Sequence, residues 1–151
     1  MNIWQTEVSI KKPPFSIPLG ASFYIIGSCF SDHLKKALID NLFRVSPSPF
    51  GIEYNPISMS QGLTRILSEN NYEEKDLILT NDGFTTWSHH SKIKYTDQYD
   101  LLKNINTQLK ESLQNIKQVD YLMVTLGTAY SYFLKDTDIA VKGVARHREL
   151  L

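Results

Sequence analysis

The sequence predicts a three-layer α/β fold, in which an open, mainly parallel sheet carries helices on both faces. Short strand-like runs alternate along the chain with segments of helical periodicity, which is the order of elements in such sheets. Two of these runs, 22–27 and 119–126, are closed by a glycine. The second run is almost continuously apolar, which predicts a central strand buried on both faces.

Length and composition predict a single domain. With 151 residues, of which 42% are hydrophobic, the chain can bury one globular core but not two. No closing helix is predicted before Leu151, so we expect residues 1–151 to be the N-terminal part of a longer domain. Residues 1–20 contain three prolines and lack periodicity, which predicts an extended lead-in packed along the domain edge.

Charge and cysteine content argue against several partners. Sixteen Lys and Arg residues balance sixteen Asp and Glu residues without a basic block, so we expect no nucleic acid and no anionic membrane as a partner. No segment approaches the roughly 18 apolar residues of a membrane span. The single cysteine excludes an internal disulfide and indicates a reducing compartment, so we expect a cytoplasmic protein.

The first half of the chain is predicted to contain two strands and two helices. After the strand at 22–27, helical spacing begins near Ser31, the expected N-cap. A short strand at 42–45 leads into a proline-rich loop, and Asn55 followed by proline then predicts a helix that ends near Ser68. The expected buried faces are Leu34, Ala37, Leu38 and Leu42 in the first helix, and Ile57, Leu63, Ile66 and Leu67 in the second.

The second half is predicted to contain a β-hairpin, a long helix and further strands. Residues 69–76 are polar and should be exposed, and the Asp-Gly between two strand-like runs predicts a hairpin within 77–87. Apolar residues at steps of three and four predict the longest helix over 98–117. Beyond the strand at 119–126, two short strands are expected around a turn at 135–138.

The two glycine-closed strands suggest where a site would lie. In open parallel sheets, sites form beyond the carboxyl ends of the strands. If the two strands are parallel neighbours, both ends and the loop at Gly51 open onto one crevice. The residues that would meet there are Gly27, Ser28, Cys29, Gly127 and Thr128.

Ser28 and Cys29 stand at the mouth of a predicted helix, and two interpretations are open for them. A nucleophile there gains from the exposed N–H groups, which favour a thiolate and donate to an oxyanion. The other interpretation is that Cys29 is a small buried hydrophobe and Ser28 a helix cap, because free cysteine is among the most buried residue types.

Three histidines are candidate bases. His33 follows Cys29 by one helical turn, and either faces the crevice or is solvated. His89 and His90 are adjacent, so at most one of them would reach the site. The pair lacks a third ligand nearby, and we expect no metal and no cofactor. Glu53, which could orient a histidine, is expected to be exposed in its loop.

Four segments resemble the GSCFA domain family, which is named for a Gly-Ser-Cys-Phe-Ala motif. They are IGSCF at 26–30, SPSPFGIEYNPIS at 46–58, SHHS at 88–91 and VTLGTAY at 124–130. Ser31 stands where the family has the final alanine. This family is similar to the SGNH (GDSL) hydrolases, three-layer α/β enzymes that cleave ester and acyl groups through a nucleophile after the first strand. The resemblance implies that fold and that chemistry.

The resemblance also implies roles for individual residues. The hydrolase Gly-Asp-Ser falls on Gly27, Ser28 and Cys29, which puts Cys29 at the position of the nucleophile. Gly51 corresponds to the glycine whose N–H serves the oxyanion hole, and Gly127 begins the block that supplies a further donor.

This sequence departs from the hydrolase pattern at two places. Ala129 stands where the hydrolases have an oxyanion-binding Asn, so Thr128 or Asn55 would have to substitute. The hydrolase Asp-x-x-His lies near the end of a longer domain, and we expect it beyond Leu151. Whether His147 corresponds to a family histidine is left open.

We therefore predict an SGNH-like hydrolase of an ester or acyl substrate, with Cys29 or Ser28 as nucleophile and His89 or His90 as base. The alternative is a non-catalytic module that binds a small molecule or glycan and keeps the crevice without the full catalytic set. In both cases the expected partner is a small-molecule, glycan or acyl ligand. The sequence does not define an oligomeric state.

Overall fold

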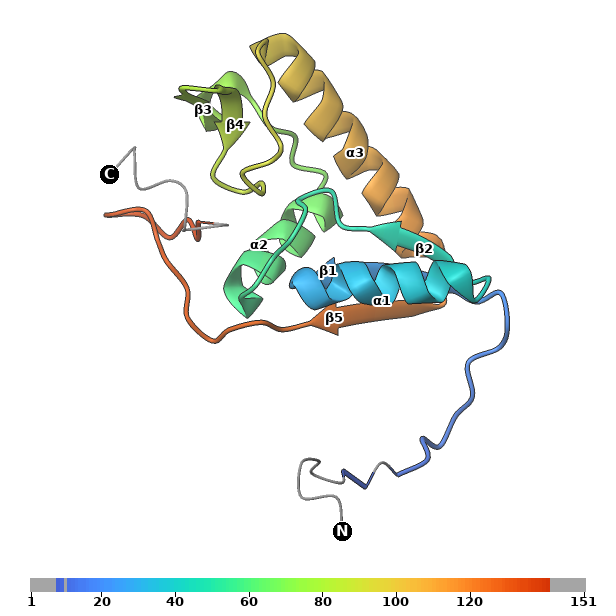
Figure 1. Cartoon of the computed structure of the whole chain (residues 1–151). Coiled ribbons are helices and arrows are strands. Elements are labelled where there is room, and N and C mark those ends of the chain that lie inside the picture. Colours follow the sequence, from blue (N-terminus) through green and yellow to red (C-terminus); the bar gives the residue numbers. More distant parts are fainter. Residues whose placement is uncertain (1–7, 10, 142–151) are drawn as a thin grey trace.

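The computed structural model describes residues 8–9 and 11–141 and shows an α/β protein with a three-stranded parallel sheet and three α-helices (Figure 1). A separate two-stranded hairpin packs against the helices. The elements in chain order are β1 (Ser22–Gly27), α1 (Cys29–Asp40), β2 (Arg44–Pro47), α2 (Pro56–Leu67), the 3₁₀ turn η1 (Glu74–Asp76), β3 (Leu77–Thr80), β4 (Gly83–Thr86), α3 (Gln98–Gln118) and β5 (Tyr121–Thr125).

The sheet has the order β2-β1-β5, and both pairings are parallel. Its register aligns Gly27 with Thr125, so β1 and β5 end side by side as expected. At the other end, Ser22 donates its backbone N–H and its hydroxyl to one carboxylate oxygen of Asp120, at 2.8 and 2.7 Å. The start and the end of the β1–β5 pairing are therefore both fixed by specific residues.

One core lies between the sheet and α1. Phe23 and Ile25 of β1 are almost fully buried, and the Phe23 ring stacks on Tyr121 of β5 with centroids 5.3 Å apart. Leu38 of α1 packs against the same cluster, together with Met123. Because successive strand residues point to opposite faces, Tyr24 and Ile26 are buried on the other side of the sheet.

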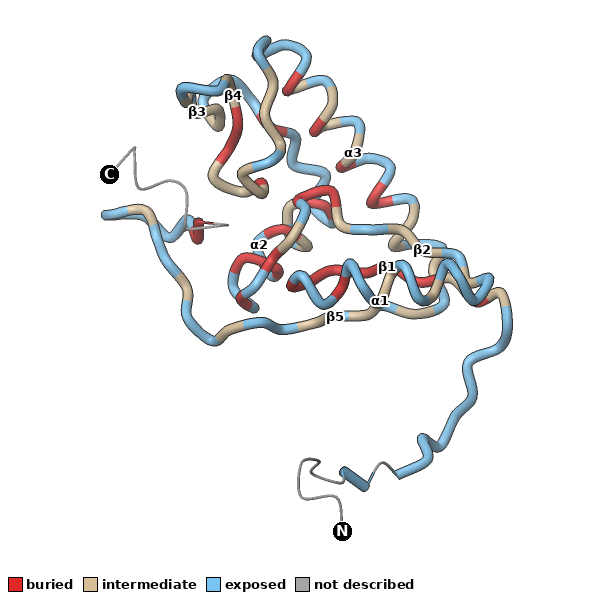
Figure 2. Tube along the Cα trace, in the orientation of Figure 1, coloured by how far each residue is buried: buried red, intermediate tan, exposed pale blue. Residues whose placement is uncertain are grey.

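A second core lies between α2, α3 and the hairpin, and Figure 2 shows its buried residues along the inner side of α3. Four of the five buried residues of α3 recur every four positions, from Leu101 to Leu113, which is the spacing of one helical face, and the fifth, Ser112, adjoins the last of them. The buried members of this core are Phe50, Ile66, Tyr72, Leu101, Ile105, Leu109 and Leu113.

Several predicted boundaries are confirmed. The strand at 22–27, the long helix and the hairpin form where the sequence places them. Asn55 is the N-cap of α2, since its side chain accepts a hydrogen bond from the Ser58 N–H. The cap of α1 is Ser28, three residues before the expected Ser31, because the helix begins directly after the strand. The Ser31 hydroxyl instead donates to the Ser28 carbonyl at 2.7 Å.

The expected burial of β5 on both faces is wrong. In the described part of the chain, β5 is an edge strand, and Leu122 and Val124 on one of its faces are 53% and 46% exposed. Its neighbours are mainly β1 and α1, so only the face toward α1 is covered. An apolar run therefore predicted the strand correctly but not its place in the sheet.

The expected buried faces of the first two helices are correct only in part. Ala37 is exposed, and Leu42 lies beyond the end of α1 with a positive φ. In α2, Ile57 and Leu67 are exposed, and of the four expected residues only Ile66 is fully buried. The residues that α2 buries are Ser58, Met59, Gly62 and Ile66.

Three other segments differ from expectation. Tyr72, in a polar run expected to be exposed, is 3% exposed. The two strands expected after β5 are reduced to one bridge between Phe133 and Ala140. The described residues from 8 to 19 are all exposed and extend away from the sheet, so they do not pack along the domain edge (Figure 1).

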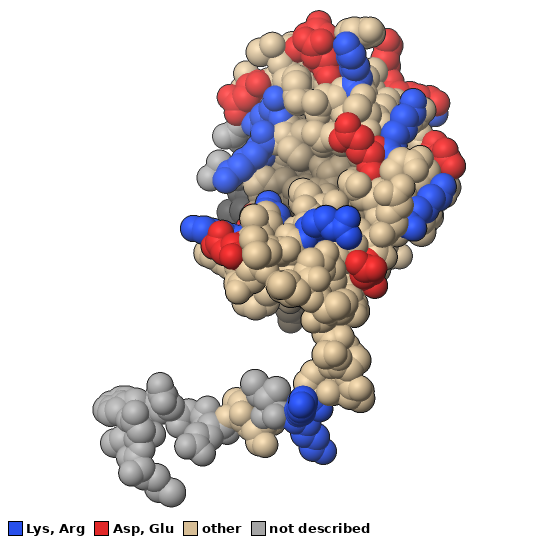
Figure 3. Space-filling view, turned by 90° about the vertical axis from the view of Figure 1, so that its right-hand side faces the viewer, with Lys and Arg blue, Asp and Glu red and all other residues tan. Residues whose placement is uncertain are grey.

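The surface carries charges of both signs. On the face shown in Figure 3, the basic and acidic side chains are interspersed. In the described ranges, no helix is both long and apolar enough to cross a membrane.

Candidate functional site

The turn after β1 is fixed to the end of β5. The Ser28 N–H donates to the carbonyl and to the hydroxyl oxygen of Thr125, both at 3.1 Å. The Ser28 hydroxyl lies 3.4 Å from the same Thr125 hydroxyl, and Ser28 is 6% exposed. Its side chain makes no capping bond to α1. Ser28 is thus a buried N-cap whose hydroxyl faces the end of the neighbouring strand.

Cys29 is the first residue of α1 and is exposed as a free thiol. The interpretation of Cys29 as a buried hydrophobe is therefore wrong. As the first residue of α1, Cys29 follows directly after the carboxyl end of β1, at the helix end where partial positive charge is concentrated. His33, one turn along the same helix, is also exposed.

Gly127 packs against both Ser28 and the loop before α2. A Cβ added at Gly127 would lie 3.0 Å from the Ser28 Cβ and 3.0 Å from Cδ1 of Tyr54, so only glycine fits without displacement. The N–H groups of Gly127 and Thr128 both donate to the Tyr54 carbonyl, at 2.8 and 3.0 Å. These two predicted oxyanion donors are brought next to Ser28, but in this conformation their N–H groups bind Tyr54.

Gly51 and Gly27 line one cavity of about 230 Å³ at the ends of β1 and β2. Gly51 has a φ of +77°, and a Cβ at this position would lie 2.8 Å from the His90 Cβ. His90 is therefore held beside Gly51, where its Nδ1 accepts the Lys92 N–H at 3.2 Å. Gly27 and Gly51 thus share one cavity and His90 lies beside Gly51, but neither His90 nor Cys29 is among the residues that line this cavity.

His89 lies elsewhere, in the core between α2, α3 and the hairpin. It is 1% exposed, and its ring packs between Phe50 and Tyr72 with centroids 5.3 and 5.0 Å away. Its Nδ1 lies 2.7 Å from the Thr86 hydroxyl. The two adjacent histidines therefore occupy different environments, as expected, although they follow a turn at 87–88 and do not lie in an extended strand.

Glu53 is buried, which corrects the expectation of an exposed loop residue. It is 1% exposed, its N–H donates to the Gly27 carbonyl at 2.8 Å, and its carboxylate accepts the Ser48 hydroxyl at 3.0 Å. Burial raises the pKa of Tyr24 and of Tyr72 to about 12, and the charge of Glu53 adds to both shifts. This carboxylate therefore lies near the end of β1 and close enough to both tyrosines to act on their ionisation.

Asn55 is engaged in capping. Its Oδ1 accepts the Ser58 N–H at 2.8 Å and its Nδ2 donates to the Ser58 hydroxyl at 3.0 Å. The amide is 6% exposed and both of its ends are used within the first turn of α2. Its predicted part in oxyanion binding would require this cap to open.

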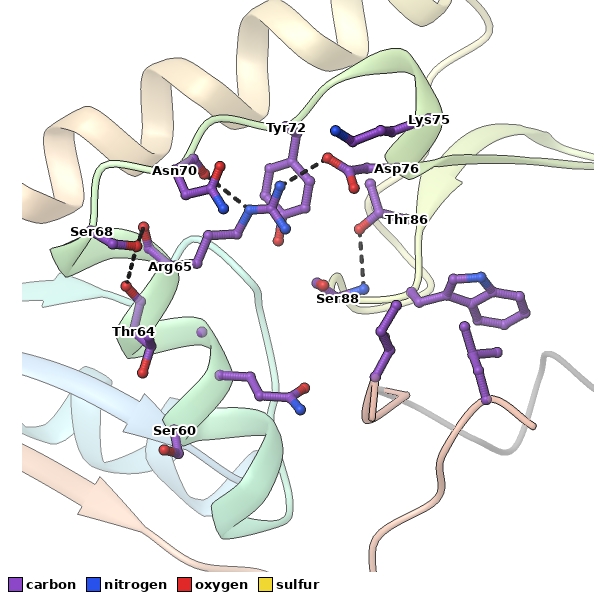
Figure 4. A pocket seen from close by; sticks show the side chains of 15 residues that line it. Ser60, Thr64, Arg65, Ser68, Asn70, Tyr72, Lys75, Asp76, Thr86 and Ser88 are labelled. Atoms are coloured by element: carbon purple, nitrogen blue, oxygen red, sulfur yellow. Dashed lines mark hydrogen bonds and ion pairs between the residues drawn. The ribbon is translucent and has the colours of Figure 1, made fainter. Parts of the chain in front are cut away.

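A larger cavity, of about 530 Å³, was not predicted from the sequence. It lies between α2, the loop after β4 and the segment following β5, as Figure 4 shows for its labelled residues. Arg65 and Tyr72 form one wall, and neither was singled out beforehand. The only sequence signal for this wall was Tyr72 itself, an aromatic residue within the otherwise polar run 69–76.

The fold and the turn after β1 define the class of protein. It is an α/β protein with a parallel sheet whose first strand ends at a Gly-Ser-Cys turn, beside the end of a second parallel strand. The GSCFA family model matches residues 22–147, and the chain belongs to this family. No curated protein and no solved structure matches the chain. Within the described ranges, no group of three or more potential ligands is placed to hold a metal ion.

Proposed function

We propose that this GSCFA protein is an SGNH-like hydrolase that cleaves an ester or acyl bond with Cys29 as the nucleophile. The observation that carries the proposal is the contrast between two neighbours: Cys29 is exposed at the first residue of α1, whereas Ser28 is 6% exposed. A substrate carbonyl can approach the thiol from solvent without any movement of the strand ends. We also propose that the chain has the three-layer arrangement of the SGNH hydrolases.

The reaction follows from the position of the thiol. The Cys29 thiolate attacks the carbonyl carbon, a C–S bond forms, and the C–O bond to the leaving alcohol breaks as the alcohol oxygen takes up a proton. Water then attacks the thioester, which releases the acid and returns the thiolate. N–H groups at the start of α1 are the donors best placed to stabilise the oxyanion.

His90 is the better placed of the two predicted bases. It touches Gly51, and Gly51 lines the same cavity as Gly27. His89 is enclosed by Phe50 and Tyr72, so a role for it in proton transfer would require the second core to open. A thiol nucleophile must stay reduced, which fits the expected cytoplasmic location.

One observation favours the non-catalytic alternative, a binding module for a small molecule or glycan. The N–H groups of Gly127 and Thr128 already donate to the Tyr54 carbonyl. The loss of one oxyanion donor typically costs about 2.7–4 kcal/mol of transition-state stabilisation. If these donors stay engaged, the turn would hold a ligand without hydrolysing it.

Mass spectrometry after exposure to activated acyl esters and thioesters distinguishes these functions. The hydrolase predicts an acyl adduct on Cys29 in the wild type and in Ser28→Ala, and none in Cys29→Ala. The exposed position of Cys29 makes Cys29→Ala a variant that should fold normally. An adduct on Ser28 instead of Cys29 would overturn the assignment of Cys29. Hydrolysis that proceeds without any adduct on Cys29 would overturn it as well. Ligand binding without turnover would favour the binding module.

A further inference from the structure

The large cavity has the features of a ligand site. Its volume of about 530 Å³ lies within the roughly 300–1,000 Å³ of small-molecule sites. Three separate segments enclose it: α2, the loop that follows β4, and the segment after β5, which contributes Leu134 and Ile139. It lies away from Cys29, which is not among the residues that line it.

Arg65 is held rigidly in the wall of this cavity. Its guanidinium carbon lies 3.5 Å from the centre of the Tyr72 ring, and Figure 4 shows the guanidinium in front of that ring. Its Nε donates to the Asn70 carbonyl at 3.0 Å, and one terminal nitrogen donates to the Asn71 carbonyl and the Asp76 carboxylate, at 3.0 and 2.8 Å. The guanidinium is thus fixed before any ligand arrives, which lowers the entropic cost of binding.

The charges that line the cavity are already paired. Arg65 forms its ion pair with Asp76, and Lys75 forms one with Glu73 at 2.7 Å. An ionic ligand would have to compete with these carboxylates. A neutral hydroxyl would not, because it can accept from a guanidinium N–H and donate to a carboxylate oxygen at the same time. The paired charges therefore favour a neutral ligand with many hydroxyl groups.

The remaining lining matches such a ligand. Ser60, Thr64 and Ser88 add side-chain hydroxyls from two different walls, and Trp87 adds an aromatic side chain beside them. Sites of this kind combine apolar and aromatic surface with a few placed polar groups that fix orientation. A sugar ring presents hydroxyls at its edge and C–H groups on its faces, so it satisfies both kinds of surface.

We propose that this cavity is a binding site for a neutral carbohydrate, separate from the turn at Cys29. The Arg65–Asp76 pair binds ring hydroxyls, and the hydroxyls of α2 and of the loop after β4 bind further ones. The inference stands independently of the hydrolase, because none of its residues takes part in acyl transfer. If both proposals hold, the substrate is an acylated glycan held at two places.

The third wall of the site is attached through Gln61. The Gln61 amide donates to the Asp138 carbonyl at 2.7 Å and accepts the Ala140 N–H at 3.1 Å, as a neighbouring strand would. This one side chain therefore connects the segment bearing Leu134 and Ile139 to α2. Gln61→Ala should loosen that wall and weaken sugar binding without affecting the fold of α2.

The test is a binding screen of the full chain against immobilised neutral oligosaccharides and their matched uronic acids, with affinities then measured by titration. We expect at least one neutral oligosaccharide to bind, with its matched uronic acid bound more weakly. Thr64→Val, which keeps the side-chain volume of an exposed residue, should weaken binding about three- to tenfold. Cys29→Ala should bind as the wild type does.

Asp76→Asn tests the charge argument directly. It leaves Arg65 without its ion pair, so the preference should shift from the neutral sugar toward the uronic acid, with proper folding checked by circular dichroism. Failure of every neutral oligosaccharide to bind would overturn the proposal, as would binding that Thr64→Val and Asp76→Asn both leave unchanged. Because Cys29→Ala is included, failure of the sugar site and failure of the hydrolase give different results.

Discussion

The guanidinium carbon of Arg65 lies over the ring of Tyr72, 3.5 Å from its centre. The ring of His89 also contacts Tyr72, with its centroid 5.0 Å away. Arg65 from α2 and His89 from the loop after β4 thus hold Tyr72 in the second core. Tyr72 is buried there although its neighbours in the chain, up to and including η1, are polar. This contact joins the wall of the carbohydrate site to the interior of the protein.

The first prediction concerns this contact. Arg65→Met should lower the free energy of unfolding by about 1–3 kcal/mol, because it removes the cation–π contact and leaves Asp76 without its partner. Urea denaturation followed by circular dichroism measures the effect. Lys75→Met is the matched control, since its ion pair with Glu73 is exposed and its loss should not be measurable. Equal losses in the two variants would show that the contact with Tyr72 contributes nothing.

The second prediction concerns the close approach of β5 to Gly27. A Cβ at this position would overlap the side chain and the backbone carbonyl of Thr125 and would lie 2.8 Å from the Thr125 nitrogen. Gly27→Ala should therefore cost about 2–5 kcal/mol of stability, because strain at a positive φ adds to the collision.

Gly20→Ala separates the two contributions. Gly20 also has a positive φ, of +79°, but nothing lies within 4 Å of an added Cβ. Only the backbone strain, about 1 kcal/mol, should then be lost. Thermal or urea unfolding of both variants checks this difference, and a Gly20→Ala variant as unstable as Gly27→Ala would contradict the close packing of β1 on β5.

The third prediction concerns the two buried tyrosines. Tyr24 and Tyr72 have a pKa of about 12 in the folded protein and of 10.0 as free side chains. Between these values the unfolded chain binds fewer protons than the folded one, so stability should fall as the pH rises above about 10. Each tyrosine contributes up to about 3 kcal/mol to this loss.

Tyr72→Phe and Tyr24→Phe should each reduce that alkaline loss of stability, whatever their effect at neutral pH. The measurement is urea denaturation at several pH values between about 8 and 11, below the range in which the whole fold is lost. A spectrophotometric titration should show that two of the eight tyrosines ionise later than the others. A pH dependence unchanged in both variants would contradict the effect of burial.

The fourth prediction concerns the bond between Asp120 and Ser22. Hydrogen bonds from the backbone and the hydroxyl of Ser22 hold the pKa of Asp120 below its usual value of 3.8. Because the folded pKa is lowered, the stabilisation is present above the unfolded value and is lost as the pH falls through the folded one.

Asp120→Asn should therefore destabilise the protein at neutral pH and flatten the decline of stability at acid pH. Ser22→Ala should have the same effect in smaller measure, because it removes the hydroxyl bond to Asp120 but keeps the backbone N–H bond. The double variant should add little to Asp120→Asn, since the hydroxyl bond is lost in both single variants. Urea denaturation at neutral and acid pH measures these differences. Additive effects of the two substitutions would show that the residues act separately.

Elements that depend on local pattern could be predicted from the sequence. The helix α3 buries residues four positions apart, and no tertiary contact is needed to recognise that spacing. The N-cap at Asn55 and the hairpin at 77–86 depend on residue types whose preference is equally local. The turn at Gly27, Ser28 and Cys29 was found for the same reason, because glycine closes a strand formed by adjacent residues.

The rest depends on contacts between distant segments. Tyr72 is buried because distant residues, Arg65 and His89 among them, pack against it, whereas the pattern of its own polar neighbours predicts exposure. Glu53 is buried because its backbone binds Gly27, from another part of the chain. The carbohydrate site combines three such segments, so no single stretch of the sequence contains a signal for it.

The pairing of β1 with β5 has a consequence for the order of folding. Ser22 and Asp120 are 98 positions apart in the chain, and Ser28 and Thr125 are 97 apart. Contacts between distant positions close large loops and form slowly, whereas α2, the hairpin and α3 follow one another closely. During synthesis the N-terminal part emerges first, so β1 must wait for β5 before its edge is paired. The turn that carries Cys29 therefore gains its hydrogen bonds to Thr125 only late in folding, so the surroundings of this thiol are incomplete in the nascent chain until the sheet has closed.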